Sequence, residues 1–443
     1  MIHVVVREYA RLTTEEGHSS LQEHSISDTA FDHLCDLAST LQIRNGLQFV
    51  TLEGYRTLRL DKFVGVIETP CGTSIEILPK SASDADEAEE SRRLLRKMLL
   101  AVRGMPSRDV GLANIESLRQ PLTEWVMAEF VSELRALVRK GIRSEYLQVE
   151  EQARFLRGRL RAGAQLKESI SRQHLFHIAH DELLPDRAEN RLLRSALEKV
   201  LNTTLNGNTW RVARELVATL ASIPCSHDHV GDFSRWSHSR LMTHYAQVRP
   251  WCEMVLGVEM PLALRGGLWG NSLLFPMDKL FECYVQVCLD VRMPPSYVLR
   301  PQISKHSLVW HQPYTLDQER SYFALTPDFI VEREKDRSTT SVLDAKWKRV
   351  DQALTKPGRF ESLYGLSQAD LYQMHAYGHS YLDGQGDIIM ISPMWTKFTD
   401  ALPPLHFSND LRLWVVPFDL ANDRLLLPSA LTHLPWVYKD WIA

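Results

Sequence analysis

The sequence has few cysteines and no long apolar run. Only six of its 443 residues are cysteine, and no two of them form a C-x-x-C pair, so neither a disulfide framework nor a zinc ribbon is indicated. No apolar run reaches the roughly 18 residues that a membrane helix needs, and the N-terminus lacks the apolar core and cleavage site of a signal peptide. We therefore expect a cytoplasmic protein without a membrane partner.

An excess of basic charge and a phosphate-binding loop are also missing. The formal net charge is -4 and the sequence pI is about 6.5, so the chain as a whole does not attract nucleic acid. Binding to a nucleic acid would need a local basic surface or a partner. The motif G-x-x-x-x-G-K-[ST] does not occur, so we expect no nucleotide to be bound by this chain itself.

The length of 443 residues predicts two or three domains, and the composition is that of a globular protein, with 44% hydrophobic and 24% charged residues. Residues 1–80 read as a β-rich module with one helix near residues 28–40, because short apolar runs alternate with Gly and Pro. Residues 81–250 read as mainly helical, with strong stripes up to about residue 220. A glycine-rich break at 265–271 marks the entry to a last domain, residues 251–443. The expected fold class is α/β, or α+β overall.

Four arginines, Arg154, Arg157, Arg159 and Arg161, lie within eight residues of the middle region. Arginine binds anions through two parallel hydrogen bonds, so this arginine strip is a candidate contact for a partner or for phosphate. An equally open alternative is a strand edge with solvated arginines.

Histidines and one cysteine form two short clusters in the middle region. His174, His177 and His180 are spaced by three, and Cys225 is followed by His227 and His229. Zinc binding by the first set would need a continuous helix, and the acidic neighbour of an H-E-x-x-H motif is missing. We expect structural histidines, and a metal-binding regulator is the alternative.

The stretch 326–348 has the pattern of a β-hairpin. Two apolar runs, 329–331 and 341–343, flank the charged, turn-forming segment 334–338. Antiparallel pairing about this turn places Asp328 opposite Asp344, and Lys346 shares a face with Asp344. Lys348 lies on the same face if the strand continues. Two carboxylates and an ammonium group are then expected to converge.

Such a group has a chemical use. Carboxylate oxygens hold Mg²⁺ against a phosphodiester, and a lysine can orient or help to deprotonate the attacking water. The plainer alternative is a solvent-facing hairpin with a salt bridge, because Asp-x-Lys is a common tripeptide.

Flanking elements add further candidate residues. A helix at 278–291 carries Glu282 beside its apolar face, where a carboxylate needs a partner or a metal. A helix at 368–381 carries Gln373 and Tyr377 on one face. Residues 387–393 read as a strand that ends the buried sheet.

This order of elements resembles the PD-(D/E)xK nuclease fold, and the Gln-x-x-x-Tyr pair makes the match more specific. Over most of its length the chain also resembles the McrC family, the nuclease subunits of McrBC-type modification-dependent restriction systems. The matching segments are 63–69, 75–80, 157–160, 181–184, 190–193, 280–285, 344–346 and 370–374.

The resemblance implies a C-terminal restriction-endonuclease-like domain with a central mixed sheet flanked by helices. It also implies a DNA endonuclease that depends on Mg²⁺, with Mn²⁺ as an alternative. In this interpretation Asp328, Asp344 and the Ala345 carbonyl bind the metal, and Lys346 positions or activates water. The supporting roles fall to the orienting carboxylate Glu282 and to the contacts Gln373, Tyr377 and Lys348.

The resemblance further implies a separate AAA+ GTPase partner of McrB type, which hydrolyses GTP and recognises methylated cytosine. The region before the nuclease would engage this ring and stimulate its GTPase, and the arginine strip is the candidate contact. A different class of function is a degenerate nuclease fold that only activates the GTPase, but the sequence retains both Asp344 and Lys346. Residues 1–80 are an extension that shorter McrC proteins lack.

Overall fold

The chain folds into two compact units. The computed structural model describes residues 2–45, 48–80, 88–103, 119–172, 174–237, 239–257, 272–312, 320–354 and 363–442. The expected glycine-rich break at 265–271 lies outside the described residues. The first unit combines both ends of the chain, whereas the second consists of Val66–Glu68 and Gln120–Leu273.

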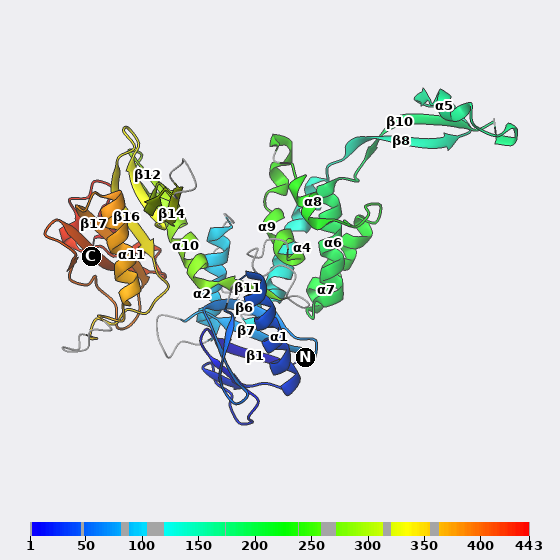
Figure 1. The fold of residues 1–443 in the computed structure, drawn as a ribbon. Coiled ribbons are helices and arrows are strands. Elements are labelled where there is room, and N and C mark those ends of the chain that lie inside the picture. Colours follow the sequence, from blue (N-terminus) through cyan, green and yellow to red (C-terminus); the bar gives the residue numbers. More distant parts are fainter. Residues whose placement is uncertain are drawn as a thin grey trace. The chain divides into compact units, whose positions relative to one another are not determined.

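The N-terminal part of the first unit contains two four-stranded sheets and one helix, α1 (Asp28–Asn45) (Figure 1). Ser27 caps this helix, since its Oγ accepts a hydrogen bond from the backbone N–H of Ala30. The described part of residues 1–80 is thus rich in strands, with one helix. The first sheet has the order β1 (Ile2–Arg7), β7 (Thr73–Leu78), β6 (Phe63–Glu68), β11 (Leu273–Pro276), and the second has β3 (Glu23–Ser25), β2 (Arg11–Thr13), β5 (Thr57–Leu60), β4 (Val50–Gly54).

The C-terminal part of the chain is joined directly to this module. Strand β11, from beyond residue 250, completes the first N-terminal sheet and leads straight into α10 (Met277–Arg292). Helix α2 (Ala88–Val102) packs against both β7 and α10. The first helix of the predicted helical region 81–250 therefore belongs to the first unit.

The C-terminal part contains a seven-stranded mixed sheet, as expected for the fold class. Helix α11 (Gln368–Tyr381) packs on one face through Met374 and Tyr377, whereas α10 reaches the sheet through Phe281 and Tyr284, whose rings contact Phe418. The strand order is β12 (Tyr297–Pro301), β15 (Phe329–Arg333), β16 (Thr339–Ala345), β17 (Gly386–Pro393), β19 (Leu411–Asp419), β18 (Leu405–His406), with β20 (Arg424–Leu425) also paired to β19.

One prediction about this sheet was wrong. The strand predicted at 387–393 is present as β17, but it lies inside the sheet, because β19 pairs in parallel along its free side. The sequence pattern identified the strand but could not show a neighbour that follows 18 or more residues later.

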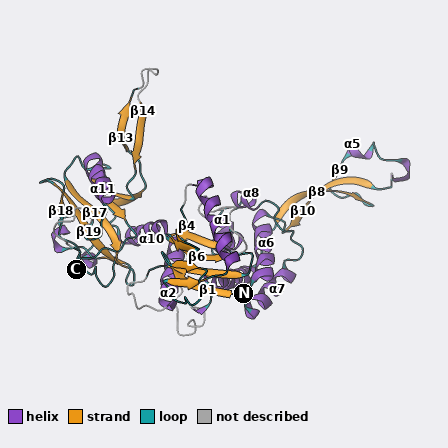
Figure 2. Cartoon of the chain, turned by 60° about the horizontal axis from the view of Figure 1, so that its bottom comes forward, coloured by secondary structure: helices purple, strands orange, loops and turns teal. Residues whose placement is uncertain are grey.

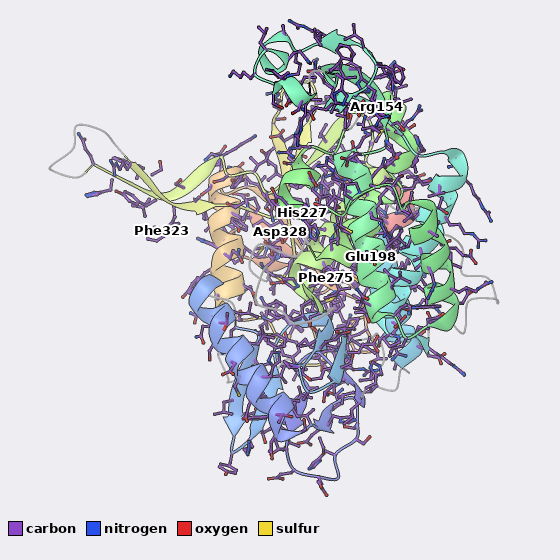
Figure 3. The ribbon with its side chains drawn as sticks, turned by 90° about the vertical axis from the view of Figure 1, so that its right-hand side faces the viewer. Arg154, Glu198, His227, Phe275, Phe323 and Asp328 are labelled. Carbon is purple, nitrogen blue, oxygen red and sulfur yellow. The ribbon has the colours of Figure 1, made fainter. Side chains whose placement is uncertain are left out.

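A separate two-stranded hairpin projects from the seven-stranded sheet (Figure 2). It consists of β13 (His306–His311) and β14 (Arg320–Leu325). Trp310 and Phe323 on this hairpin are exposed, and Phe323 is labelled in Figure 3.

The second unit is a helical body with a projecting arm. The body contains α4 (Leu122–Lys140), α6 (Ala188–Thr203), α7 (Gly207–Thr219), α8 (His229–Ser234), α9 (Arg249–Leu256) and the 3₁₀ helix η3 (Arg240–Tyr245). The arm is an antiparallel sheet with the order β8 (Glu145–Ala153), β10 (Phe176–Leu184), β9 (Arg159–Leu160), together with α5 (Ala162–Gln165) and η2 (Ile170–Arg172).

The arm corrects the prediction that the chain is mainly helical up to about residue 220. The described residues between 145 and 184 form strands, loops and two very short helices, and the side chains of β8 are partly or fully exposed. Because neither face of this strand is buried, its sequence lacks the apolar alternation from which a strand is predicted. Among the described residues, no helix is long and apolar enough to cross a membrane.

Candidate active site

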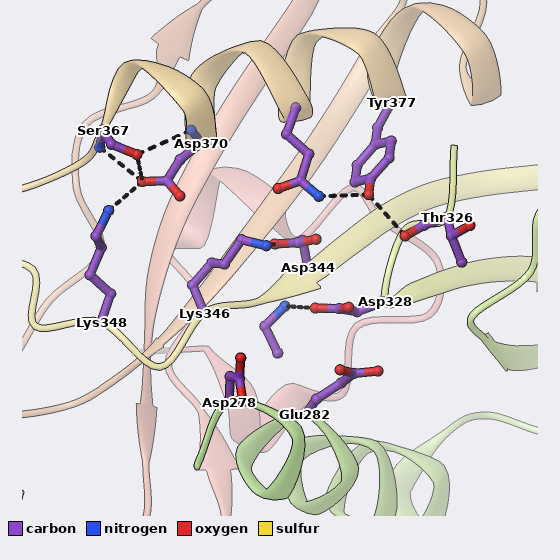
Figure 4. A network of polar contacts seen from close by, with 12 residues as sticks. Asp278, Glu282, Thr326, Asp328, Asp344, Lys346, Lys348, Ser367, Asp370 and Tyr377 are labelled. Atoms are coloured by element: carbon purple, nitrogen blue, oxygen red, sulfur yellow. Dashed lines mark hydrogen bonds and ion pairs between the residues drawn. The ribbon is translucent and has the colours of Figure 1, made fainter. Parts of the chain in front are cut away.

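The predicted hairpin forms, and it brings the two aspartates together. Strands β15 and β16 pair antiparallel with Phe329 opposite Leu343, so the register continued by one residue sets Asp328 opposite Asp344. The backbone N–H of Ala345 donates to Oδ2 of Asp328 at 2.8 Å (Figure 4). The carboxylate of Asp328 is therefore fixed at the end of the strand that carries Asp344.

Asp344 is a fully buried carboxylate, with a relative exposure of 0%. Lys346 Nζ lies 2.8 Å from its Oδ2 in an ion pair. Within the described part of the chain, no hydrogen bond of good geometry reaches either of its carboxylate oxygens. Burial raises the pKa of Asp344, and the ammonium of Lys346 opposes that rise. A buried carboxylate with unused acceptor capacity is suited to a further cationic ligand.

Asp328 lies in the same electrostatic environment as Asp344. Burial, followed by the nearby Asp344 and Glu282 carboxylates, raises the pKa of Asp328 to about 7, although the Ala345 N–H and Lys346 oppose the shift. Burial by itself would lower the pKa of Lys346, but Asp344 and the other nearby carboxylates outweigh burial and raise it. The lysine therefore stays protonated beside an excess of negative charge.

Glu282 is held by two partners on the floor of the site. It lies on α10 with a relative exposure of 6%, and it accepts hydrogen bonds from Lys279 Nζ at 2.6 Å and from Gln302 Nε2 at 2.5 Å. Gln302 has φ +46° and its backbone N–H donates to the carbonyl of Asp328 at 2.9 Å. Sequence reasoning missed Lys279 and Gln302, although the position of Lys279 three residues before Glu282 was a usable signal.

Gln373 and Tyr377 lie on one face of α11, as predicted. Gln373 Nε2 donates to the Tyr377 hydroxyl, which donates to the carbonyl of Thr326, each at 2.8 Å. Burial raises the pKa of Tyr377 to about 12, so this hydroxyl remains a donor at neutral pH. Tyr377 thereby fixes the backbone two residues before Asp328, whereas Gln373 lines the cleft.

The prediction for Lys348 needs a correction in its geometry. Strand β16 ends at Ala345, and the backbone N–H of Lys348 donates to the carbonyl of Lys346, so the strand does not continue. Lys348 instead pairs with Asp370 on α11 at 2.5 Å. Asp370 also forms the capping box of that helix with Ser367 (Figure 4). The sequence contains this capping pattern, but only the fold places it beside the lysine.

Many of these side chains line an open cleft with a volume of about 550 Å³, and the fully buried Asp344 lies behind its wall. Its lining includes four carboxylates, those of Asp278, Glu282, Asp328 and Asp370. Six cationic side chains also line it, so the acidic chain has a local basic surface of the kind that phosphate binding requires. They belong to Lys62, Lys80, Lys279, Lys346, Lys348 and Arg349.

The donor set fits a hard divalent cation in its chemistry. Asp328 and Asp344 supply carboxylate oxygens, Glu282 lies nearby, and the orphaned oxygens of Asp344 leave capacity for a ligand. Among the described residues, however, no three His, Cys, Asp or Glu side chains already form a closed metal site. A role for the Ala345 carbonyl stays a prediction.

The histidine and cysteine clusters do not come together as metal sites within the described residues. His177 and His180 lie on strand β10 and not on a helix. His177 Nε2 contacts Glu168 at 2.6 Å. Neither cluster in the described structure therefore supports the alternative of a metal-binding regulator.

The arginine strip lies on the projecting arm of the second unit. Arg154 (Figure 3) and Arg157 are in the segment between β8 and β9, Arg159 is on β9, and Arg161 pairs with Glu150. All four arginines are exposed. Exposed apolar side chains accompany them on the arm, namely Tyr146, Phe155, Leu156, Leu166, Ile170 and Leu183.

Gly158, within the strip, has φ +69°, and a Cβ at this position would lie 2.5 Å from the carbonyl oxygen of Ala179. The close approach of the strip to β10 therefore requires glycine.

Comparisons with known proteins agree with this architecture. Residues 58–393 match the family described as McrBC 5-methylcytosine restriction system component. A chain from the refined half-complex of the tetradecameric assembly of Thermococcus gammatolerans McrB AAA+ hexamers with bound McrC is similar in fold. It has a TM-score of 0.67 and 18% identity, and the similarity covers 94% of each chain.

A chain from the cryo-EM structure of the Thermococcus gammatolerans McrBC complex has a TM-score of 0.50 and 20% identity, covering 65% of this chain and 87% of that one. No curated protein matches the sequence.

Proposed function

Since the chain belongs to the McrBC 5-methylcytosine restriction system component family, we propose that it is the DNA-cleaving subunit of such a system. In this proposal it hydrolyses phosphodiester bonds of methylcytosine-containing DNA together with an AAA+ GTPase partner of McrB type. It also stimulates the partner's GTP hydrolysis. The observation that carries the proposal is the convergence of Asp328, Asp344 and Lys346, of which Asp328 and Lys346 line a basic cleft and Asp344 is buried directly beside it.

Each residue of the cleft has a distinct role in the proposal. Asp328 and Asp344 hold Mg²⁺, with Glu282 orienting the site. When bound, the cation would polarise the phosphodiester and lower the pKa of the attacking water. Lys346 orients that water and offsets negative charge on the phosphate, because its ammonium already lies beside Asp344.

The remaining cleft residues contact the DNA backbone or support the carboxylates. Lys348 lines the cleft at the N-terminus of α11, where its ammonium can approach a phosphate. Gln373 lines the same cleft, and Tyr377 holds the segment that leads into Asp328. The side-chain amide of Gln302 keeps Glu282 in place.

The arm is proposed to engage the AAA+ ring. Residues 154–161 of the arm are exposed, and the arm carries both the arginine strip and several exposed apolar side chains. Interfaces commonly combine arginine with large apolar residues. The similar Thermococcus chains come from complexes with McrB, which supports a hetero-oligomer for this chain too.

The test uses the chain in complex with its AAA+ partner, GTP and Mg²⁺. Asp344→Asn keeps the shape of the buried side chain but removes its charge, so cleavage should fall below ~1% of the unmodified complex. GTP hydrolysis should be unchanged. The matched control is Asp410→Asn, because Asp410 is exposed and does not line the cleft.

The two candidate functions give different results. Robust cutting by the Asp344→Asn complex would rule out this site as the source of cleavage. An unmodified complex that stimulates GTP hydrolysis but cuts no methylated DNA would favour the non-catalytic activator.

A further inference from the structure

The cleft is not built by the nuclease-like part alone. Three residues of the N-terminal module, Tyr9, Lys62 and Lys80, line it together with Lys346 and Lys348. All of them belong to the first compact unit. The module thus supplies two of the cationic side chains that face the space beside the carboxylates.

A buried carboxylate joins this module to the segment that follows β16 and bears Lys346 and Lys348. Glu8 has a relative exposure of 0%. It accepts hydrogen bonds from Trp347 Nε1, at 2.8 Å and 3.0 Å to its two oxygens, and from the backbone N–H of Lys80 at 2.9 Å. Trp347 lies between Lys346 and Lys348 in sequence, and its ring contacts Phe281 on α10.

Burial of Glu8 is energetically costly. It raises the pKa of this carboxyl group, and the hydrogen bonds from Lys80 and Trp347 only partly oppose the shift. Both oxygens of this fully buried carboxyl group accept hydrogen bonds. Glu8 therefore holds Lys80 and Trp347 in a defined position relative to each other.

The backbone beside Glu8 is also unusual. Tyr9 has φ +63°, a left-handed conformation that is rare for a bulky residue and persists only where the surroundings enforce it. This conformation sets Tyr9 at the cleft, where the Lys80 ammonium lies 4.0 Å from the centre of its ring.

A second contact fixes Lys62. Its backbone carbonyl accepts a hydrogen bond from the N–H of Met277 at 2.8 Å, at the start of α10. Its ammonium lies 2.6 Å from Oδ2 of Asp278 and stays partly exposed, with a side-chain exposure of 47%. The lysine is therefore anchored by its backbone and retains contact with solvent in the cleft.

We propose that the N-terminal module forms a second wall of the DNA cleft, in which Lys62 and Lys80 contact backbone phosphates. Glu8 holds this wall against the segment after β16 that carries Lys346 and Lys348. The inference rests on the proposed function, because it assumes that the cleft receives DNA. It assigns the N-terminal 80 residues a part in substrate binding.

The test measures how DNA affinity depends on salt, using the complete complex with a non-hydrolysable GTP analogue and a methylated duplex, without divalent metal. Each lost phosphate contact reduces the slope of log K against log salt by about 0.9. Lys62→Gln with Lys80→Gln should reduce the slope by about 2 and weaken binding at low salt. Lys335→Gln is the control, since Lys335 is exposed in the β15–β16 turn and does not line the cleft.

The variant Asp278→Asn distinguishes a DNA contact of Lys62 from a role of Lys62 in its salt bridge with Asp278. If Lys62 contacts phosphate, removing its acidic partner should leave affinity unchanged or increase it. If Lys62 acts only through the ion pair, Asp278→Asn and Lys62→Gln should weaken binding alike, and the assignment of Lys62 would be overturned.

Trp347→Phe tests the role of Glu8, because it removes the indole N–H without changing the charge. The salt slope should decrease, since the wall is no longer held in place. If the variant loses thermal stability but the slope of log K against log salt does not change, the Glu8 contact stabilises the fold and has no role in DNA binding.

The two proposals can fail separately. If the complex cuts DNA but the double lysine variant binds with the slope of the control, only the second wall is refuted. If the complex does not cut, yet the slope decreases as expected, the nuclease assignment fails and the DNA contact stands.

Discussion

The cleft and the arm are both rich in charged residues, but they use charge in opposite ways. At the cleft, Asp344 and Glu282 are buried, and their carboxylates help to raise the pKa values of Asp328 and Lys346. On the arm, the four arginines of the strip are exposed among exposed apolar side chains. Burial suits a site for chemistry, where a low dielectric strengthens each interaction, whereas exposure suits a surface that becomes buried only when a partner binds.

The first test separates these two regions. Phe155 on the arm is 82% exposed, so Phe155→Asp should leave the fold intact while it places a charge in the proposed interface. We expect stimulation of the partner's GTPase to fall by about tenfold or more, the scale of an interfacial hot spot. The measurement is the GTPase rate over a range of chain concentrations.

The control in the cleft region is Asp344→Asn. This variant should stop DNA cleavage but should still stimulate the partner's GTPase. If Phe155→Asp stimulates the GTPase like the unmodified chain, the arm is not the main contact with the ring.

A second prediction distinguishes the two lysines of the cleft. Lys346→Ala should lower the cleavage rate by ~10² with nearly unchanged DNA affinity, because Lys346 is the cation that contacts Asp344. Lys348→Ala should act mainly on affinity and its salt dependence, since Lys348 pairs with Asp370 at the cleft edge. Single-turnover rates at saturating DNA measure the difference. Equal losses of rate for both variants would show that these roles are assigned wrongly.

A third prediction concerns pH. Asp328 has a pKa of about 7 in the metal-free protein, so below that pH a proton competes with a divalent cation for this carboxylate. Affinity for Mg²⁺ should therefore fall by up to about tenfold per pH unit below pH 7 and level off above it. Calorimetry in buffers of different ionisation enthalpy would detect the released proton. Binding that does not change between pH 5.5 and 8 would contradict a role for Asp328 as a ligand.

The same pKa predicts the sign of a stability effect. Folding raises the pKa of Asp328, so between about pH 4 and about 7 the folded chain holds a proton that the unfolded chain releases. The stability of the metal-free protein should therefore decrease as pH rises through this window. Asp328→Asn should be more stable than the unmodified chain at pH 8, by ~1–2 kcal/mol. Thermal unfolding at pH 5 and pH 8 tests this, and no gain at pH 8 would contradict the electrostatic account.

The smallest expected effect concerns the support of the site. Tyr377→Phe removes the hydrogen bond to the Thr326 carbonyl, which should cost ~1 kcal/mol of stability and reduce cleavage several-fold. The matched control is Tyr372→Phe on the same helix, because Tyr372 is 66% exposed. If both variants have the same cleavage rate, the hydrogen bond of Tyr377 does not support cleavage and the side chain contributes only to packing.

The local sequence was enough to predict the hairpin and the pairing of Asp328 with Asp344, although not the shift of register between Val331 and Glu332. The apolar runs of β15 and β16 and the turn between them are local, and antiparallel pairing then dictates that Asp328 faces Asp344. Helix α10 could be predicted from its apolar periodicity, which places Glu282. Helix α11 has only weak apolar periodicity, but the capping pattern of Ser367 and Asp370 marks its start, and the four-residue spacing then places Gln373 and Tyr377 on one face. Local patterns of this kind need no knowledge of distant neighbours.

The partners of the site residues from distant parts of the chain could be identified only in the tertiary structure. The pairing of Lys348 with Asp370, the contact of Gln302 with Glu282 and the contact of Glu8 with Trp347 span 22, 20 and 339 residues of sequence. Strand β8 of the arm was not predicted, because a strand with no buried face carries no apolar alternation. Long-range contacts depend on how the whole chain packs, and a single sequence holds no local signal for them.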